Sequence, residues 1–581
     1  MSLYDKSSLV LIPSGTKTGK VYSQVPVSGD GDFTFTRSSA ATRVNADGFI
    51  EKETSNLMLQ SNAFNNWSGD PTLTSGQTGY DGSSDAWLLD ATSVNQFIYR
   101  NDVTSFSGVT TISVYAKKGT ADGIRLRFNQ SSDANIYINL INGSDVGAAS
   151  GTISHNVTNL GSGWYRIEMS FIASGSQDFR IYPTDVTGTS VVGSIYIQDV
   201  QAEQGLVARD YIETTTTAVE GGITDNVPRL DYTDSSCPAL LLEPQRTNSV
   251  DYSEYYNLFH VNVTLTTNAG TSPEGVDNAS KIVVSSQSQP RIERFNTWSN
   301  STTYSMSAYV KADTGRYIGF GLYSPEMGNQ WVRFDLTNET FGYNDTYWSN
   351  AAIVDAGNNW YKISATITTD AVNSSRSGFK LVSMKSDAYN IGTIGDSFFV
   401  YGLQVETGSY ATSYIPTYGS SVTRVQDSFY DNNYQANNIF GANSGSIFFD
   451  FGDDFTLFDG VSNSYPIDRM QFVDITSYGG GYMRFRGGES NHYFQLVSMG
   501  AADNSLSFTN QTKYCICWDS NGVDFYGDGA LIDSTTIEIV PSINRIENGL
   551  SGTQRETRIK EILFFTTKLS SQEAIDLTTI V

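Results

Sequence analysis

The sequence is poor in the residues that form disulfide frameworks or bind metals. Its 581 residues include only 3 cysteines and 3 histidines. Cys237 stands alone, whereas Cys515 and Cys517 are neighbours on one face of an expected strand, so the cysteines predict no disulfide framework. We therefore expect the fold to be stabilised by the burial of its core alone.

Basic side chains are also scarce. The 36 lysines and arginines are outnumbered by 61 aspartates and glutamates, which gives a formal net charge of −25. Such a charge repels phosphate backbones and anionic lipids, and no long cluster of basic residues offsets it locally. We therefore expect no nucleic acid among the partners of this protein.

Long apolar runs are missing as well. The run near the N-terminus, residues 9–13, is too short for the hydrophobic core of a signal peptide. No segment approaches the roughly eighteen apolar residues that a membrane-spanning helix needs. We expect a soluble protein that is made in the cytoplasm and does not insert into a membrane.

The composition and the residue pattern are typical of β-structure. Charged residues make up only 17%, whereas there are 52 glycines and 34 tyrosines. Residues 163–171 and 359–367 alternate apolar and polar side chains, the pattern of a strand with one face on the core. Both stretches contain Trp-Tyr-(Arg/Lys)-Ile, which makes them look like copies of one another.

Other segments repeat at a similar offset. Residues 113–117 match residues 307–311, and residues 201–205 match residues 404–408. The offset grows slightly along the two copies, as expected if only surface loops have changed in length. The short strands are separated by Gly, Ser, Asn and Asp, without helical patterns between them, which favours antiparallel sandwiches.

The repeat predicts an all-β protein made of tandem antiparallel β-sandwiches of the jelly-roll type. Ser570 and Glu573 form a capping box that predicts a short C-terminal helix. The predicted parts are an N-terminal arm at 1–54, a first sandwich at 55–215, a connector at 216–239, a second sandwich at 240–420 and a third β-domain at 430–581.

Several motifs resemble those of a class of bacteriophage virion proteins. They lie at residues 9–15, 31–37 and 41–45, and in the connector at residues 227–232 (Val-Pro-Arg-Leu-Asp-Tyr) and 237–248. The proteins that this sequence resembles are surface components of the tail-fibre or receptor-binding type. They carry tandem sandwiches similar to carbohydrate-binding modules.

The C-terminal third resembles a laminin-G or concanavalin-like jelly roll. The whole resemblance implies that residues 1–54 form a virion-facing N-terminal arm or a segment packed between domains, and it implies a place on the virion surface and other virion proteins as partners. It also implies assembly as a homo-oligomer, often a trimer.

The sequence assigns no catalytic residue. His155, His260 and His492 lie one in each domain, so a histidine-centred triad would need domains to share a site. Glu203 and Glu406 occupy equivalent positions in the two copies and are the candidates for a carboxylate pair of the kind glycosidases use. The alternative, which we favour, is a polar role on the last strand of each sandwich.

The sequence leaves a metal site open and predicts no other cofactor. Oxygen ligands of the type that calcium prefers could come from several aspartates, but none follows the spacing of the twelve-residue calcium loop. The resemblance implies that such sandwiches often hold a structural calcium ion. The candidate aspartates are Asp30, Asp32, Asp453, Asp454 and Asp528.

Aromatic side chains in polar loops are the candidates for glycan binding. The faces of sugar rings stack on aromatic rings, while polar side chains hydrogen-bond the hydroxyl groups. Trp298 and Trp348 lie in polar stretches and are predicted to be exposed, and Tyr478 and Tyr482 flank three glycines. The alternative for these residues is core packing or contact between protomers.

These observations predict a phage virion structural protein, in a tail or head fibre or of the receptor-binding type. Its lectin-like domains are expected to bind host-surface glycans without catalysis. One alternative is a purely architectural decoration, collar or spacer protein. The other is a polysaccharide depolymerase, which would need two carboxylates in an open groove.

Overall fold

The computed structural model shows an all-β protein. It describes residues 2–580 except 102–105, 149, 175–177, 258, 295–297, 344–346, 372–377, 387, 390, 432–438, 440–443, 453–466, 474–481, 488–491, 498–503, 509–510, 537–544 and 549–555. Of the strands at 467–473, 482–487, 492–497, 504–508 and 545–548 only the backbone is described. All strand pairs among the described residues are antiparallel, which confirms the predicted fold class.

The first sandwich consists of two six-stranded sheets with the orders β16-β17-β12-β19-β10-β9 and β15-β14-β13-β18-β11-β8. Apolar side chains from both sheets form one core between them. The strands are β8 (Ser68–Gly69), β9 (Thr72–Gln77), β10 (Ala86–Ala91), β11 (Ile98–Arg100), β12 (Gly108–Lys118), β13 (Gly123–Asn129), β14 (Ala134–Asn139), β15 (Asp145–Ala148), β16 (Thr152–Gly161), β17 (Trp164–Ala173), β18 (Asp178–Thr184) and β19 (Gly193–Gln204), with a 3-10 turn at η1 (Phe64–Asn66).

The second sandwich repeats this arrangement with the orders β25-β26-β35-β28-β33-β32 and β24-β27-β34-β29-β30-β31. Its own apolar core lies between the two sheets. The strands are β24 (His260–Val261), β25 (Val263–Gly270), β26 (Ala279–Val284), β27 (Arg291–Arg294), β28 (Thr303–Ala312), β29 (Tyr317–Ser324), β30 (Gly328–Asp335), β31 (Thr340–Tyr343), β32 (Trp348–Asp355), β33 (Tyr361–Thr368), β34 (Phe379–Met384) and β35 (Ser397–Thr407).

The third sandwich is built from both ends of the chain. One sheet has the order β1-β48-β38-β43-β44-β45, and the other has the order β2-β3-β4-β37-β46-β39-β40-β41-β42. The strands are β1 (Leu9–Leu11), β2 (Thr16–Lys17), β3 (Lys20–Val21), β4 (Phe33–Thr36), β37 (Ser428–Asp431), β38 (Gly445–Asp450), β39 (Ile467–Val473), β40 (Tyr482–Gly487), β41 (His492–Val497), β42 (Asn504–Phe508), β43 (Lys513–Asp519), β44 (Gly522–Gly527), β45 (Ala530–Thr535), β46 (Arg545–Asn548) and β48 (Glu561–Phe565).

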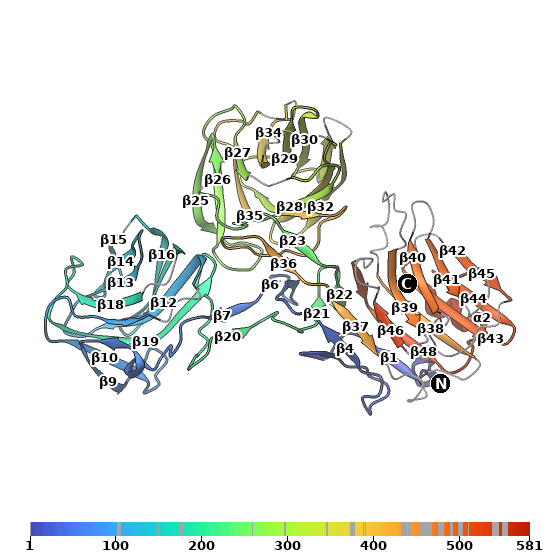
Figure 1. Ribbon diagram of the computed structural model, residues 1–581, viewed down its shortest axis with the longest axis horizontal. Helices are drawn as coiled ribbons and strands as arrows, with labels where there is room; N and C mark the ends of the chain where they lie inside the picture. Colours follow the sequence, from blue (N-terminus) through green and yellow to red (C-terminus); the bar gives the residue numbers. More distant parts are fainter. Residues whose placement is uncertain are drawn as a thin grey trace.

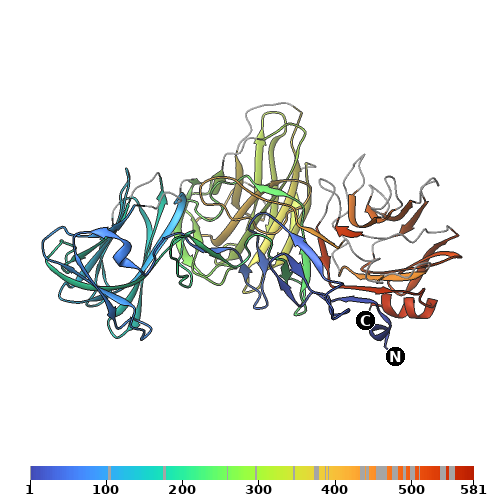
Figure 2. The ribbon, with the colours of Figure 1, turned by 60° about the horizontal axis from the view of Figure 1, so that its bottom comes forward.

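This arrangement differs from the expected N-terminal arm at residues 1–54. Leu9, Val10 and Leu11 of β1 pair with residues of β48, and β4 pairs with β37. The physical reason is burial, because Leu9, Leu11 and other apolar residues of this segment belong to the core of the third sandwich. Figure 2 shows the two ends of the chain side by side at this sandwich.

Two short helices also lie in the third sandwich, α1 (Leu3–Lys6) and α2 (Ser571–Thr578). The predicted capping box at the start of α2 is present: the Ser570 hydroxyl accepts from the Glu573 amide, and the Glu573 carboxylate accepts from the Ser570 amide at 3.0 Å. Neither helix is long and apolar enough to cross a membrane.

Four small sheets connect the sandwiches. Figure 1 shows the three sandwiches as separate lobes, with these strands between them. The pairings are β5 with β6, β7 with β20, β23 with β36, and β21-β22-β47. The strands are β5 (Arg43–Val44), β6 (Ile50–Glu51), β7 (Thr54–Asn56), β20 (Val219–Gly221), β21 (Arg229–Asp231), β22 (Ala239–Leu242), β23 (Arg246–Asn248), β36 (Val422–Arg424) and β47 (Thr557–Ile559).

Candidate functional site

Both tryptophans predicted to be exposed belong to the core of the second sandwich. Trp298 is 6% exposed and Trp348 is 3% exposed. The Trp298 ring meets Tyr304 edge to face at a centroid distance of 4.8 Å, and Trp348 stacks near Phe320 at 6.5 Å. This burial contradicts the prediction that either ring is free to stack on a sugar, because its faces already contact protein.

The two candidate tyrosines of the third sandwich have no described side chain. Tyr478 lies outside the described residues. Tyr482 begins β40, of which only the backbone is described. A role of these residues in glycan binding therefore stays a prediction.

Glu203 and Glu406 hold the chain that follows the last strand of each sandwich. Glu203 is 2% exposed and accepts a hydrogen bond from the Arg209 amide at 2.9 Å. Glu406 is fully buried and accepts from the Thr412 amide, also at 2.9 Å. Both carboxylates thus accept hydrogen bonds from the backbone of the segment that they hold in place. This agrees with the favoured polar role rather than with catalysis.

Around each glutamate the same polar contacts recur, and we call them the clasp of the sandwich. In the first copy Gln201 accepts from the Ile212 amide at 2.7 Å, and in the second copy Gln404 accepts from the Ile415 amide at 2.7 Å. A serine–tyrosine hydroxyl pair at 2.6 Å closes each clasp, Ser61 with Tyr211 and Ser253 with Tyr414. An asparagine, Asn56 or Asn248, bridges the last strand and the clasp segment through two carbonyl oxygens.

The first clasp contacts the second sandwich through buried charges. We call Lys52, Arg209, Glu254, Glu274 and Tyr401 the inter-sandwich cluster. The Lys52 ammonium lies 2.8 Å from a Glu254 oxygen and 2.6 Å from a Glu274 oxygen, and Arg209 pairs with both Glu203 and Glu274. Burial would raise the pKa of Glu274, but Arg209 and Lys52 lower it to about 2.

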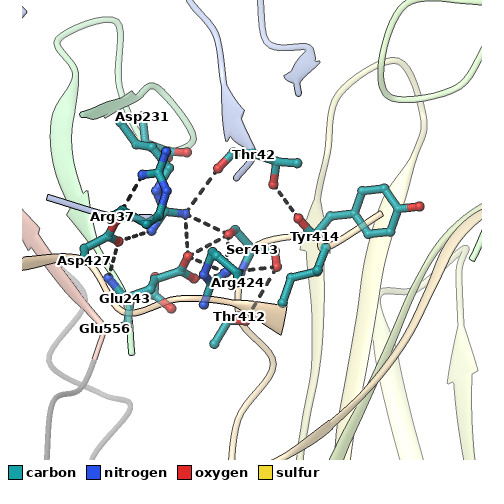
Figure 3. Close-up of polar contacts among 12 residues, drawn as sticks. Arg37, Thr42, Asp231, Glu243, Thr412, Ser413, Tyr414, Arg424, Asp427 and Glu556 are labelled. Atoms are coloured by element: carbon teal, nitrogen blue, oxygen red, sulfur yellow. Dashed lines mark hydrogen bonds and ion pairs between the residues drawn. The ribbon is translucent and has the colours of Figure 1, made fainter. Parts of the chain in front are cut away.

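The second clasp contacts a different group of buried charges, which we call the hub. The hub consists of Arg37, Arg229, Glu243, Ser413, Arg424 and Asp427, all of which except Arg229 are labelled in Figure 3. Glu243 accepts from Arg229 at 2.5 Å and from Arg424 at 2.8 Å, and it also accepts from the Ser413 amide at 2.7 Å. The charged side chains of the hub are at most 1% exposed.

Asp427 completes the hub on its other side. It pairs with Arg37 at 3.0 Å and also with Arg229, and it accepts from the Glu243 amide at 2.8 Å. Arg37 further donates to the carbonyl oxygens of Ser39 and Thr224. The hub residues come from four segments, so the hub ties the N-terminal segment (Arg37), the connector motifs (Arg229 and Glu243), the second clasp (Ser413) and the chain entering the third sandwich (Arg424 and Asp427).

The electrostatics of the hub keep its charges ionised. Burial would raise the pKa of Glu243, but Arg424 and Arg229 hold it well below its usual range. Burial lowers the pKa of Arg37 to about 10, which still leaves the guanidinium charged at neutral pH. Breaking such a buried pair leaves an uncompensated charge, so each member depends on the others.

Three hub residues lie in the N-terminal and connector motifs of the sequence. Arg37 ends the motif at 31–37, Arg229 lies in the motif at 227–232, and Glu243 lies in the motif at 237–248. Sequence reasoning singled out these motifs but did not predict that their charged residues meet. The available signal was an arginine or glutamate directly at the end of an apolar strand, because a charge that is buried there needs a partner of opposite charge.

A cavity of about 750 Å³ lies beside the hub. One wall is the edge of the second sandwich at β32 and β33, and the opposite walls come from β5, β6, the connector and β47. The hub residues Glu243 and Ser413 line it, as do the clasp residues Thr412 and Tyr414. Such a volume lies within the range of about 300–1,000 Å³ that is usual for small-molecule sites.

The aspartates considered as calcium ligands are dispersed. Asp30, Asp32 and Asp528 accept hydrogen bonds from protein groups nearby, whereas Asp453 and Asp454 lie outside the described residues. Within the part of the chain that the structure describes, no three His, Cys, Asp or Glu side chains gather in a way that could hold a metal ion. A structural calcium ion therefore stays a prediction.

Comparison with known proteins gives only distant similarities. No protein-family model and no curated protein matches this chain. The tandem CBM22-1-CBM22-2 domain from Paenibacillus barcinonensis aligns with 61% of this chain and 97% of its own, at 12% identity and a TM-score of 0.21. The LG1-3 region of the laminin alpha2 chain aligns with 83% of this chain and 97% of its own, at 9% identity and a TM-score of 0.16. At these TM-scores neither similarity carries an argument about function.

Proposed function

We propose that this protein is a non-catalytic structural protein on the surface of a bacteriophage particle. In this role it displays its sandwiches and binds glycans on the host surface. The observation that carries the proposal is the hub, in which charged residues from the N-terminal segment, the connector motifs and the chain entering the third sandwich bond to one another. A display protein needs its domains held in a fixed arrangement. A buried ionic hub can hold them, because any domain movement would leave a buried charge without its partner.

The resemblance of the motifs to phage virion proteins supports the same proposal. Arg37, Arg229 and Glu243, which belong to these motifs, are hub residues. The resemblance therefore concerns the part of the molecule that sets its architecture. We propose other virion proteins as partners, assembly as a homo-oligomer and a location at the virion surface.

The roles of Glu203 and Glu406 support the absence of catalysis. Both carboxylates are buried and accept hydrogen bonds from the backbone of their own clasp. A glycosidase needs two carboxylates facing a groove that admits the substrate. This pair instead holds two separate clasps, one in each sandwich.

A purely architectural protein is the second candidate function. It is favoured by one observation, the burial of Trp298 and Trp348 in the core of the second sandwich. In that case the sandwiches would act as spacers within the particle and would bind no sugar.

A glycan array that includes host-surface polysaccharides tests the proposal on the full chain. We expect saturable binding and no shortening of the bound polysaccharide, which size-exclusion chromatography would measure. Absence of binding to the whole array would favour the architectural role, and shortening would favour a depolymerase. Mass spectrometry of purified phage particles would test the location, and absence of the chain from the particles would contradict it.

A further inference from the structure

We propose that the cavity beside the hub is the glycan site, and that it accepts neutral oligosaccharides rather than anionic ones. This inference rests on the proposed function, because it assigns a place and a ligand class to the glycan binding proposed above. It uses different residues from Trp298 and Trp348, whose rings are part of the core.

The cavity has the mixed lining that sugars need. Tyr232 contributes a half-buried ring, whereas Tyr309, Tyr410 and Tyr414, which also border the cavity, are 8%, 7% and 2% exposed. Polar side chains at the edge of the second sandwich, among them Asn350, Lys362 and Ser364, line the cavity as well. The Tyr232 ring offers contact to the C–H face of a sugar, and the polar groups offer hydrogen bonds to its hydroxyls.

Lys362 is well placed to donate to a ligand. Its ammonium donates to the Thr412 carbonyl oxygen at 2.8 Å, and Thr412 itself lines the cavity. An ammonium group has three donors, so this contact orients the group and leaves donor capacity toward the cavity.

The charge of the lining selects against anionic sugars. Arg558 contacts three carboxylates, those of Asp231, Asp234 and Glu556, and all four residues line the cavity. Asp355 adds a further exposed carboxylate at the edge of the second sandwich. A uronic or sialic acid would therefore approach a lining in which carboxylates outnumber cations: Asp231, Asp234, Glu243, Asp355 and Glu556 against Arg43, Lys362 and Arg558.

The two sandwich copies explain why the cavity occurs beside the second one. Ala352 of β32 faces Ser364 of β33 at the edge of the second sandwich. In the first sandwich the equivalent pair is Asn156 and Glu168, and Glu168 reaches across to accept from the Ala208 amide. Small residues in the second copy leave open the volume that larger polar residues occupy in the first.

The test fills the cavity without removing any of its polar groups. Ala352→Trp places a large side chain into it, and Asn156→Trp is the matched control at the equivalent edge of the first sandwich. Hexamers of glucose and N-acetylglucosamine serve as neutral probes together with neutral host polysaccharides from the array, and hexamers of galacturonate and sialic acid serve as anionic probes. Titration calorimetry measures binding, and circular dichroism with thermal unfolding verifies that each variant is folded.

We expect the full chain and the Asn156→Trp variant to bind a neutral probe equally well. The Ala352→Trp variant should bind the same probe at least tenfold more weakly. The full chain should bind the anionic probes at least tenfold more weakly than the neutral one. Lys362→Met, which keeps the length of the side chain without its donors, should also weaken binding if Ala352→Trp fails to fold. Neutral binding that survives in folded Ala352→Trp and in Lys362→Met would overturn the inference and leave the proposed function standing. Tighter binding of an anionic probe would overturn the ligand class, and absence of all glycan binding by the full chain would overturn the inference and the proposed glycan binding together.

Discussion

The two sandwich copies share a clasp but differ in what the clasp holds. In the first copy Arg209, whose amide donates to the clasp glutamate Glu203, extends its side chain into the inter-sandwich cluster. In the second copy Thr412 stands at the position of Arg209, and the next residue, Ser413, bonds to Glu243 of the hub. The comparison teaches that a repeated set of internal contacts can serve two connections when neighbouring positions of the clasp segment supply the outward contact.

The copies also differ in how closely they approach their neighbours. The first sandwich meets the second through backbone, since the Val109 amide donates to the Tyr418 carbonyl oxygen at 2.6 Å. The second sandwich meets the third across the hub and the cavity, through side chains and the three-stranded sheet β21-β22-β47. The first contact thus adds a close backbone approach to the buried charges of the inter-sandwich cluster, whereas the second combines the charges of the hub with an open cavity.

Removal of the Glu243 carboxylate from the hub should have the largest effect on the stability of the protein. Glu243→Gln leaves Arg229 and Arg424 buried without their shared partner, so we expect a loss of about 3–5 kcal/mol in the free energy of unfolding. Urea unfolding monitored by tryptophan fluorescence would measure it. Asp122→Asn, which removes the exposed Lys118–Asp122 pair, is the control and should cost less than about 1 kcal/mol. An equal effect of the two substitutions would contradict the role of the hub.

Trp348 sharpens the comparison of the two cores. It stands where the first sandwich has Thr152, since Trp348 pairs with Ile367 and Thr152 with the equivalent Phe171. Because the ring is buried, Trp348→Ala should cost about 3–5 kcal/mol of stability through the cavity that it leaves. Thermal unfolding of the variant would measure the loss. A stable Trp348→Ala variant that had lost glycan binding would show instead that the ring acts in recognition.

A substitution at Gly108 tests the close backbone contact between the first two sandwiches. Its φ is +66°, and a Cβ at this position would lie 1.7 Å from the Tyr418 carbonyl oxygen. We therefore expect Gly108→Ala to cost more than the roughly 1–2 kcal/mol of a left-handed alanine and to loosen the first sandwich from the second. Limited proteolysis between the sandwiches would measure this loosening. Unchanged cleavage and stability would show that this approach does not hold them together.

Acid should weaken both charged groups. The pKa of Glu274 is lowered to about 2 from 4.5, and that of Glu243 is also held well below its usual range. A carboxyl group with a lowered pKa in the folded state stabilises the protein fully above its unfolded pKa, and this stability is lost as the pH falls from about 4.5 toward about 2. The melting temperature should therefore fall through this window, and Glu274→Gln should flatten the fall.

Between pH 8 and pH 5 a smaller change of opposite sign is expected. Burial and neighbouring carboxylates raise the pKa of Glu53 and of Asp199 to about 7. A raised carboxyl pKa makes the folded state more stable as the pH falls through about 7, because the folded state binds the proton first. Calorimetry should show a slight rise in melting temperature on mild acidification, which Asp199→Asn would reduce.

The sequence allowed the fold class to be predicted because the signal is local. Alternating residues such as those of 163–171 mark a strand wherever it lies, and Ser570 with Glu573 marks the start of a helix within one turn. The partner of a strand carries no such local signal. The pairing of β1 with β48 joins the two ends of the chain, and an arm at 1–54 was therefore the wrong expectation.

The candidate site was less predictable for a related reason. Trp298 and Trp348 have polar neighbours in the sequence, but Trp348 begins β32, where its ring points inward while Ser349 is exposed, and Trp298 lies between β27 and β28 with its ring against Tyr304. The cavity depends on residues from β5, β32 and β47, which lie far apart in the sequence. Its position follows from tertiary contacts, which no single segment reveals.

Small-angle X-ray scattering of the intact chain tests the central claim that the hub holds the sandwiches in one arrangement. The account predicts that the curve of the unmodified protein fits the single arrangement seen in Figure 1. It also predicts that Glu243→Gln, while each sandwich stays folded, has a larger radius of gyration and requires a mixture of arrangements. An unmodified protein whose curve already requires independently moving sandwiches, or a folded Glu243→Gln variant with an unchanged curve, would contradict the account.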